Sequence, residues 1–217
     1  PEVEFEDAVD AQSGDAYLAI VDGQWWIQYW GSSTTDGYML SYDAGVASIT
    51  GDGTYTVSVN ADTNGFRYDT TGDPNGEYVP GGLSFMAVII KDGETATPDA
   101  IITVDKVVVD GNEIELKSKN YTNTEDGGVR ANLLNTYVST PSGDARSVEG
   151  FLFNDYDASS LALDNVDEYS AQVVDPADFG SWKKIEVTFT VTGMGGDAAQ
   201  ADDDSNADAG AADADAE

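Results

Sequence analysis

The chain has 217 residues, with 41 Asp and Glu against 9 Lys and Arg, a formal net charge of −32, and neither Cys nor His. This charge opposes binding to nucleic acid, whose phosphates require clustered Lys and Arg, and binding to anionic membranes. The two missing residue types exclude disulfides, thiolate and imidazole metal ligands, Cys nucleophiles and Ser-His-Asp catalysis. No run approaches the roughly 20 apolar residues that span a bilayer. Neutral polysaccharide, divalent cations and basic proteins remain as partners.

Both ends of the chain are acidic and differ in composition from its middle. Residues 1–14 predict an acidic leader or a first edge strand. We expect residues 195–217, rich in Ala and Asp, to be disordered because they bury too little apolar surface. Residues 15–194 then form one β-sandwich domain. The chain opens at Pro1 without a recognisable signal peptide, which indicates a mature or trimmed fragment.

The first predicted element is a hairpin around Asp22-Gly23, beside three of the four tryptophans. An Asp-Gly pair between two β-prone runs favours a two-residue turn, which places Ile20 opposite Trp25. Side chains alternate across a strand, so this hairpin has two faces. The predicted core face carries Leu18, Ile20, Trp25, Ile27 and Tyr29, and the opposite face carries Tyr17, Ala19, Val21, Trp26, Gln28 and Trp30.

The rest of the chain shows apolar residues with period two, which is typical of half-buried strands. Only residues 159–169 and 175–179 are compatible with short helices. Asp110-Gly111 predicts a second tight hairpin. This order of elements predicts an all-β fold, a two-sheet antiparallel β-sandwich of the jelly-roll type. The further strands are expected within residues 54–59, 83–90, 107–109, 112–116, 129–138, 148–153 and 185–191.

The aromatic face of the first hairpin is a candidate sugar-binding site. Carbohydrate C–H faces stack on indole and phenol rings, while hydroxyl groups need amide, carboxylate or guanidinium partners. A long loop between residues 60 and 82 adds an arginine flanked by aromatic residues, and loops of this length are often functional. The alternative is that the tryptophans are buried in the core and that the arginine pairs with a nearby Asp. The candidate sugar-binding residues are Tyr17, Trp26, Gln28, Trp30, Arg67 and Tyr68.

The same loop contains a candidate calcium site. Calcium takes six to eight oxygen ligands from carboxylates, amides and carbonyls, and Asp69, Asp73, Asn75 and Glu77 lie close together in the sequence. Their spacing differs from that of an EF-hand. The alternative is a set of plain solvated turns, since acidic turns occur throughout the chain.

Two segments resemble a known family. Residues 51–59, Gly-Asp-Gly-Thr-Tyr-Thr-Val-Ser-Val, look like a strand of jelly-roll carbohydrate-binding modules, and residues 182–191, in which a Trp precedes alternating Val, Thr and Phe, look like their closing strand. With residues 16–20 and the tryptophan cluster, the chain resembles domains of secreted or lipid-anchored Gram-positive surface proteins. The resemblance implies an exported two-sheet fold, often with a structural calcium, and a sugar site on one sheet face or a loop rim.

We therefore expect non-catalytic, extracellular binding of a polysaccharide or oligosaccharide. The alternative is a cell-surface structural or protein-interaction domain without a small ligand. We do not expect an enzyme: two carboxylates about 5–9 Å apart can cleave glycosides, but among so many acids some pair meets that spacing by chance. The acidic surface keeps an extracellular domain soluble, and adaptation of a proteome to salt produces the same bias.

Overall fold

The structure is a computed structural model of the chain, and it describes residues 10–23, 28–32, 40–41, 44–60, 66–67, 82–138, 141–154, 157–161 and 168–195. The predicted leader lies outside the described residues except for 10–14, and the predicted acidic tail lies outside them except for Gly195. The described part contains no helix that is long and apolar enough to span a membrane.

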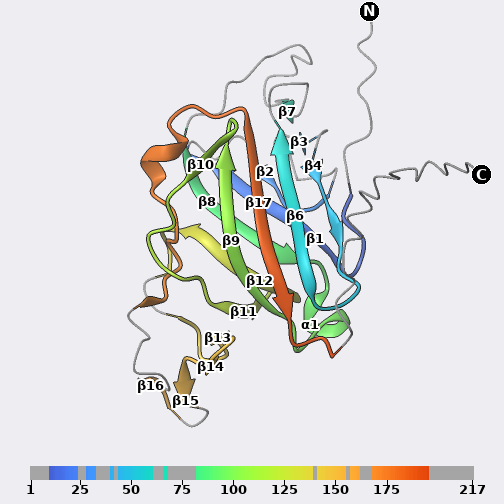
Figure 1. The fold of residues 1–217 in the computed structure, drawn as a ribbon, viewed down its shortest axis with the longest axis vertical. Helices are drawn as coiled ribbons and strands as arrows, with labels where there is room; N and C mark the ends of the chain where they lie inside the picture. The colour runs from blue at the N-terminus through green and yellow to red at the C-terminus, as the bar shows by residue number, and fades with distance from the viewer. Residues whose placement is uncertain are drawn as a thin grey trace, which may run out of the picture.

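Two antiparallel sheets pack face to face, and their strands cross when the molecule is seen as in Figure 1. The larger sheet has the order β14 (Gly150–Phe151), β13 (Arg146–Ser147), β11 (Thr122–Glu125), β12 (Gly128–Asn135), β8 (Leu83–Ile90), β1 (Asp15–Asp22), β2 (Gln28–Tyr29), and β5 (Ala47–Ser48) also pairs with β1. The smaller sheet has the order β10 (Asn112–Ile114), β9 (Ile101–Val109), β17 (Lys184–Thr192), β6 (Gly53–Asn60), β4 (Ala44–Gly45). The predicted two-sheet sandwich is confirmed.

Smaller elements complete the described part. Two separate strand pairs are β3 (Leu40–Ser41) with β7 (Phe66–Arg67), and β15 (Phe153–Asn154) with β16 (Asp157–Leu161). The helices are α1 (Gly93–Ala96) and the 3-10 helix η2 (Pro176–Phe179). The helix predicted within residues 175–179 is therefore confirmed, whereas the one predicted from residue 159 is wrong at its start, because residues 159–161 belong to β16.

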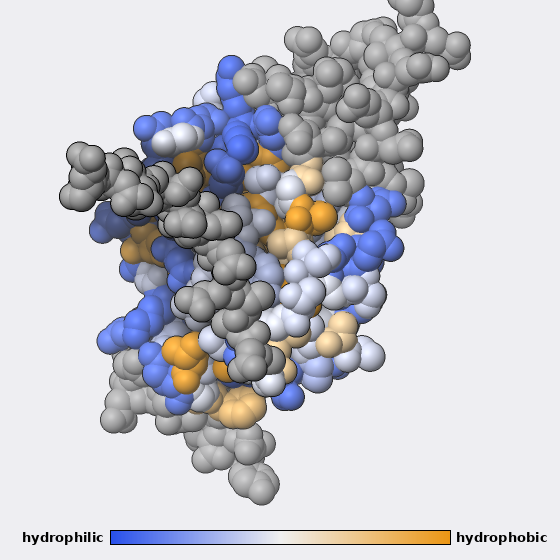
Figure 2. Space-filling model, turned by 45° about the vertical axis from the view of Figure 1, so that its right-hand side comes forward, coloured by the Kyte–Doolittle hydropathy of each residue, from blue (hydrophilic) through white to orange (hydrophobic). Residues whose placement is uncertain are grey.

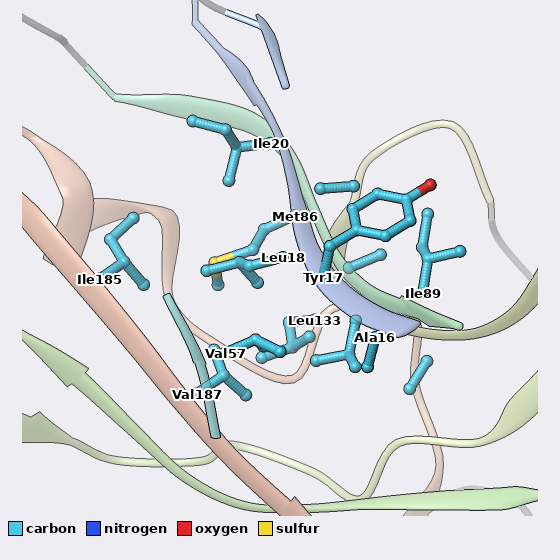
Figure 3. Packing of buried hydrophobic residues seen from close by; sticks show 14 of the residues in the cluster. Ala16, Tyr17, Leu18, Ile20, Val57, Met86, Ile89, Leu133, Ile185 and Val187 are labelled. Atoms are coloured by element: carbon cyan, nitrogen blue, oxygen red, sulfur yellow. The ribbon is translucent and has the colours of Figure 1, made fainter. Parts of the chain in front are cut away.

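Alternation of side chains gives the larger sheet an inner face toward the smaller sheet and an opposite, outer face, and along β1 both faces are buried. Leu18 and Met86 point toward Val187 of the smaller sheet, whereas Tyr17 and Ile89 point to the opposite side (Figure 3). Strand β17 alternates strictly between buried and partly exposed positions, as its sequence predicts. Strand β8 is buried at seven of its eight positions, which fits its place inside the sheet.

Polar side chains join the two sheets at the edge of β9. Thr122 Oγ accepts the N–H of Ile102 at 2.8 Å and donates to the carbonyl of the same residue at 3.0 Å. Asn120 Oδ1 accepts the N–H of Val104 at 2.8 Å, and its amide donates to the Ile102 carbonyl at 2.7 Å. These bonds satisfy edge groups that would otherwise be open to pairing with another strand.

Figure 2 shows one face, on which hydrophobic residues form small separate patches among hydrophilic ones. On the smaller sheet, Thr56 and Thr188 face each other across β6 and β17 with their hydroxyls 3.2 Å apart. The large hydrophobic residues exposed in the described part are Tyr137, Val148 and Phe151.

The two Asp-Gly hairpin predictions have different outcomes. Asp110-Gly111 forms the predicted two-residue turn, with φ of 51° and 82° and Val109 paired with Asn112. The prediction of a two-residue turn at Asp22 is wrong, because Ile20 pairs with Tyr29 and not with Trp25. Asp22 is fully buried and continues β1 opposite Leu83, so the strand does not reverse there.

Candidate functional site

The outer face of the larger sheet carries a row of side chains from three neighbouring strands. Tyr17 of β1 pairs with Ile89 of β8, and Ile89 pairs with Arg130 of β12. Paired residues project to the same side of an antiparallel sheet. The row therefore places a phenol ring and a guanidinium group on either side of an aliphatic side chain.

A hollow of about 240 Å³ opens over this row. We call it the Trp30 hollow. Lys91 and Asp92 reach it from the turn after β8, and Glu125 and Asp126 reach it from the turn between β11 and β12. The two turns are joined by a hydrogen bond of 3.0 Å from the Glu94 N–H to the Gly127 carbonyl. Its lining residues are Tyr17, Trp30, Ile89, Lys91, Asp92, Glu125, Asp126, Gly128 and Arg130.

Arg130 is the central polar group of the Trp30 hollow. Its side chain is 6% exposed and forms ion pairs with Glu125 at 2.8 Å and with Asp126 at 3.8 Å. The guanidinium carbon lies 5.5 Å from the centroid of the Phe85 ring, within the range of a cation–π contact. Its buried Nε–H has no hydrogen-bond partner. The carboxylates compensate the charge of a residue type that is rarely buried without partners.

Trp30 forms the aromatic wall of the hollow. Its ring packs on Phe85, with centroids 5.0 Å apart and planes at 31°. The indole N–H donates to Gln28 Oε1 at 3.0 Å. These two contacts fix the orientation of the indole while its side chain stays partly exposed. Gln28 therefore positions Trp30 and is not itself a lining residue of the hollow.

Tyr17 forms the floor of the hollow beside Ile89. Burial raises the pKa of Tyr17 to about 12, against the opposing effect of the Arg130 charge. The phenol therefore stays neutral over the physiological pH range. Gly31 allows this packing, because a Cβ at that position would lie 2.7 Å from the Tyr17 ring.

The structure brings three of the six predicted sugar-binding residues together. Tyr17 and Trp30 line one hollow, and Gln28 holds Trp30. The backbone of Arg67 lies in β7, where it pairs with Leu40. The remaining sugar-binding and calcium predictions lie outside the described residues: Trp26, Tyr68, Asp69, Asp73, Asn75 and Glu77. Within the described part of the chain, no group of three or more acidic residues is arranged to hold a metal ion.

The charged half of the hollow was not predicted from the sequence. Arg130 lies in a strand that the alternation predicted, but its partners are supplied by turns. Asp92 and Asp126 each precede a glycine and adopt a φ near +50°. The sequence predicts a turn at each of these Asp-Gly pairs. Only the order of the strands brings the two turns together at the Trp30 hollow.

A second, larger groove of about 560 Å³ lies beside the start of β9. Lys119 lies 3.6 Å from Glu149 and 3.1 Å from Glu168. Glu149 accepts hydrogen bonds from Tyr169 and from Ser147, the latter at 2.8 Å. The bond from Tyr169 is the largest cause that lowers the pKa of Glu149 to about 2. This network joins residues 168–169 to the hairpin of β13 and β14.

Comparisons of the chain with family models, with curated proteins and with solved structures find no match.

Proposed function

We propose that the chain binds carbohydrate without altering it, and that the Trp30 hollow is the binding site. The observation that supports this most directly is an oriented, partly exposed indole that shares one hollow with a buried arginine and three carboxylates. Aromatic faces hold the apolar side of a sugar ring, and charged groups hold its hydroxyls. A hollow of about 240 Å³ suits one or two sugar rings rather than a long cleft.

The roles of the side chains follow from their contacts. Trp30 would stack on the C–H face of the ring, and its fixed orientation limits the conformational entropy lost on binding. Carboxylate oxygens of Asp92 and Asp126 would accept hydrogen bonds from hydroxyl groups. Arg130 lies 3.8 Å from Asp126 and would donate to a ring substituent.

Three further expectations belong to the same proposal. These are a jelly-roll topology, an extracellular or cell-surface location with a glycan partner, and a structural calcium bound by the predicted acidic loop. The sequence resemblance supports all three, and the confirmed two-sheet sandwich supports the first alone. The chain would act as a binding module and not as an enzyme.

The test is a titration of the full chain with a panel of soluble oligosaccharides, read by acrylamide quenching of tryptophan fluorescence and by calorimetry. We expect at least one oligosaccharide to bind, and Trp30→Ala to weaken it about tenfold or more, equivalent to about 1.4 kcal/mol. Tyr137→Ala is the matched control, since it removes an aromatic ring that is 65% exposed and is not part of the hollow.

The control variant should bind as tightly as the unaltered chain. Binding that survives Trp30→Ala, or a panel in which nothing binds, would overturn the proposal. A folded Trp30→Ala variant is confirmed by an unfolding transition of undiminished cooperativity.

A further inference from the structure

We infer that the Trp30 hollow selects glycans that carry free, protonated amino groups over neutral or acidic glycans. This inference rests on the proposed function and names the class of ligand for that same site. Two observations carry it: the charges of the side chains around the hollow, and the ion pairs and hydrogen bonds that these side chains already form.

The hollow contains more negative than positive side chains. Asp92, Glu125 and Asp126 face Lys91 and Arg130, three carboxylates against two cations. The chain as a whole carries a net charge of −32, so the field of the whole protein would repel a uronate or sulfate group. The same negative charge attracts an ammonium group.

The two cations of the hollow are already engaged. Arg130 directs its terminal nitrogens at Glu125 and Asp126. The Lys91 ammonium group donates a hydrogen bond to the carbonyl of Ala11 at 2.7 Å. Among the described residues, Asp92 has no ion pair, and its side chain is exposed at the rim. One carboxylate is therefore open to a cation from outside.

The aromatic rings favour the same class of ligand. A cation near the face of Trp or Tyr is attracted by the ring quadrupole, and Trp30 and Tyr17 both line the hollow. A sugar ring with a protonated amine combines an apolar face, hydroxyl groups and a cation. It would place its C–H face on Trp30, its ammonium group at Asp92, and a hydroxyl oxygen toward Arg130.

The backbone makes a clean substitution possible. Asp92 and Asp126 adopt φ of 52° and 53°, the left-handed region that Asn tolerates as well as Asp. Asp92→Asn and Asp126→Asn therefore remove charge with little strain. Asp110→Asn is the control for backbone conformation, because Asp110 has φ of 51° and precedes a glycine in the same way. Asn keeps the Oδ1 atom that accepts the N–H groups of Lys183 and Lys184 in the fold. It lies in the turn between β9 and β10, at the other end of the molecule from α1 (Figure 1).

The experiment compares the glucosamine trisaccharide with the N-acetylglucosamine trisaccharide, at a pH at which the amines are protonated and the carboxylates ionised. We expect the full chain to bind the amine form about tenfold tighter. Since pairs at the rim are solvent-exposed, Asp92→Asn should reduce that preference about threefold, and the double variant with Asp126→Asn should nearly abolish it. Asp110→Asn should keep it.

The outcomes separate this inference from the proposed function. Equal binding of both trisaccharides, lost in Trp30→Ala, would overturn the amine preference and leave carbohydrate binding intact. Binding of neither trisaccharide would overturn the amine preference, and the oligosaccharide panel would decide separately on carbohydrate binding. A preference unchanged in the double variant would show that the general acidic surface attracts the amine and would overturn the assignment to this hollow. Trilysine that competes as well as the glucosamine trisaccharide would identify a basic peptide as the occupant and overturn the inference.

Discussion

Arg130 and Glu125 form a 2.8 Å ion pair in which the arginine side chain is 6% exposed and the glutamate 44%. The pair spans the hairpin between β11 and β12 and holds the guanidinium group against the hollow. Because only Arg130 is buried, substitutions of Arg130 and of Glu125 should change the free energy of unfolding by different amounts.

The first prediction concerns this pair. Glu125→Gln should lower the free energy of unfolding by about 1–2 kcal/mol, because a buried charge loses its nearest counter-ion while Asp126 remains. Arg130→Met, which removes the buried charge together with its need for a partner, should cost less than Arg130→Lys, which keeps the charge without the guanidinium fork. Urea unfolding measures all three. A Lys variant as stable as the unaltered chain would contradict the prediction.

The second prediction concerns Gly31 and the packing of Tyr17. Gly31 has φ of +73°, and a Cβ there would lie 2.7 Å from a ring carbon of Tyr17. Gly82 has φ of +74° with no atom within 4 Å of its Cβ position, so Gly82→Ala is a matched control for backbone strain alone. Both variants should lose about 1–2 kcal/mol from the left-handed conformation, and Gly31→Ala a further 1–3 kcal/mol or so from the clash. Equal losses in chemical denaturation would show that the ring moves aside freely.

The third prediction concerns the acid dependence of stability. The pKa of Glu149 is lowered from 4.5 to about 2, first through the hydrogen bond from Tyr169. A depressed carboxylate pKa stabilises the fold above the unperturbed pKa of 4.5, and this contribution is lost as pH falls from there through the folded value. Since the Glu149 side chain is 42% exposed, we expect no more than about 1 kcal/mol.

The pH dependence is measured by urea unfolding between pH 6 and pH 2. In Glu149→Gln the free energy of unfolding should fall less steeply as the pH is lowered through this range. Tyr169→Phe should show an intermediate pH dependence, because Ser147 still donates a hydrogen bond to the carboxylate. Curves that run parallel for all three proteins would contradict the assignment.

The fourth prediction concerns salt. With a net charge of −32, the folded chain repels itself more than the expanded chain does, and added salt screens this repulsion. The Tm should rise by about 5 °C or more between roughly 0.1 M and 2 M NaCl. Sucrose at matched osmolality distinguishes screening from exclusion of solute from the surface. An unchanged Tm in NaCl would show that the acidic groups are too dispersed to matter.

The fifth prediction concerns calcium and the loop that contains Asp69, Asp73, Asn75 and Glu77. If these residues bind a structural calcium ion, its removal by EDTA should lower the Tm, and added CaCl₂ should restore it by mass action. Asp73→Asn should remove the response. The same Tm with chelator and with calcium would end that hypothesis.

The sequence by itself determined the class of fold and the direction of most side chains. Period-two alternation in 54–59 and in 185–191 is a local property, because neighbouring side chains of a strand must point to opposite faces. That rule placed Tyr17 and Leu18 on opposite faces of the strand, as the structure confirms, but it did not predict that Tyr17 is buried as well. Asp110-Gly111 likewise formed the turn that its two residues favour.

Only the tertiary structure decided the register of the first hairpin and the composition of the hollow. Asp22 carries the same turn signal as Asp110, but pairing of β1 with β8 extends the strand through Asp22 and displaces the reversal. Arg130 and Tyr17 line the same hollow because their strands, β12 and β1, both pair with β8. Asp92 and Asp126 line it because their two turns lie at the same end of the sheet. Such contacts depend on strand order over more than a hundred residues, which local propensity does not encode.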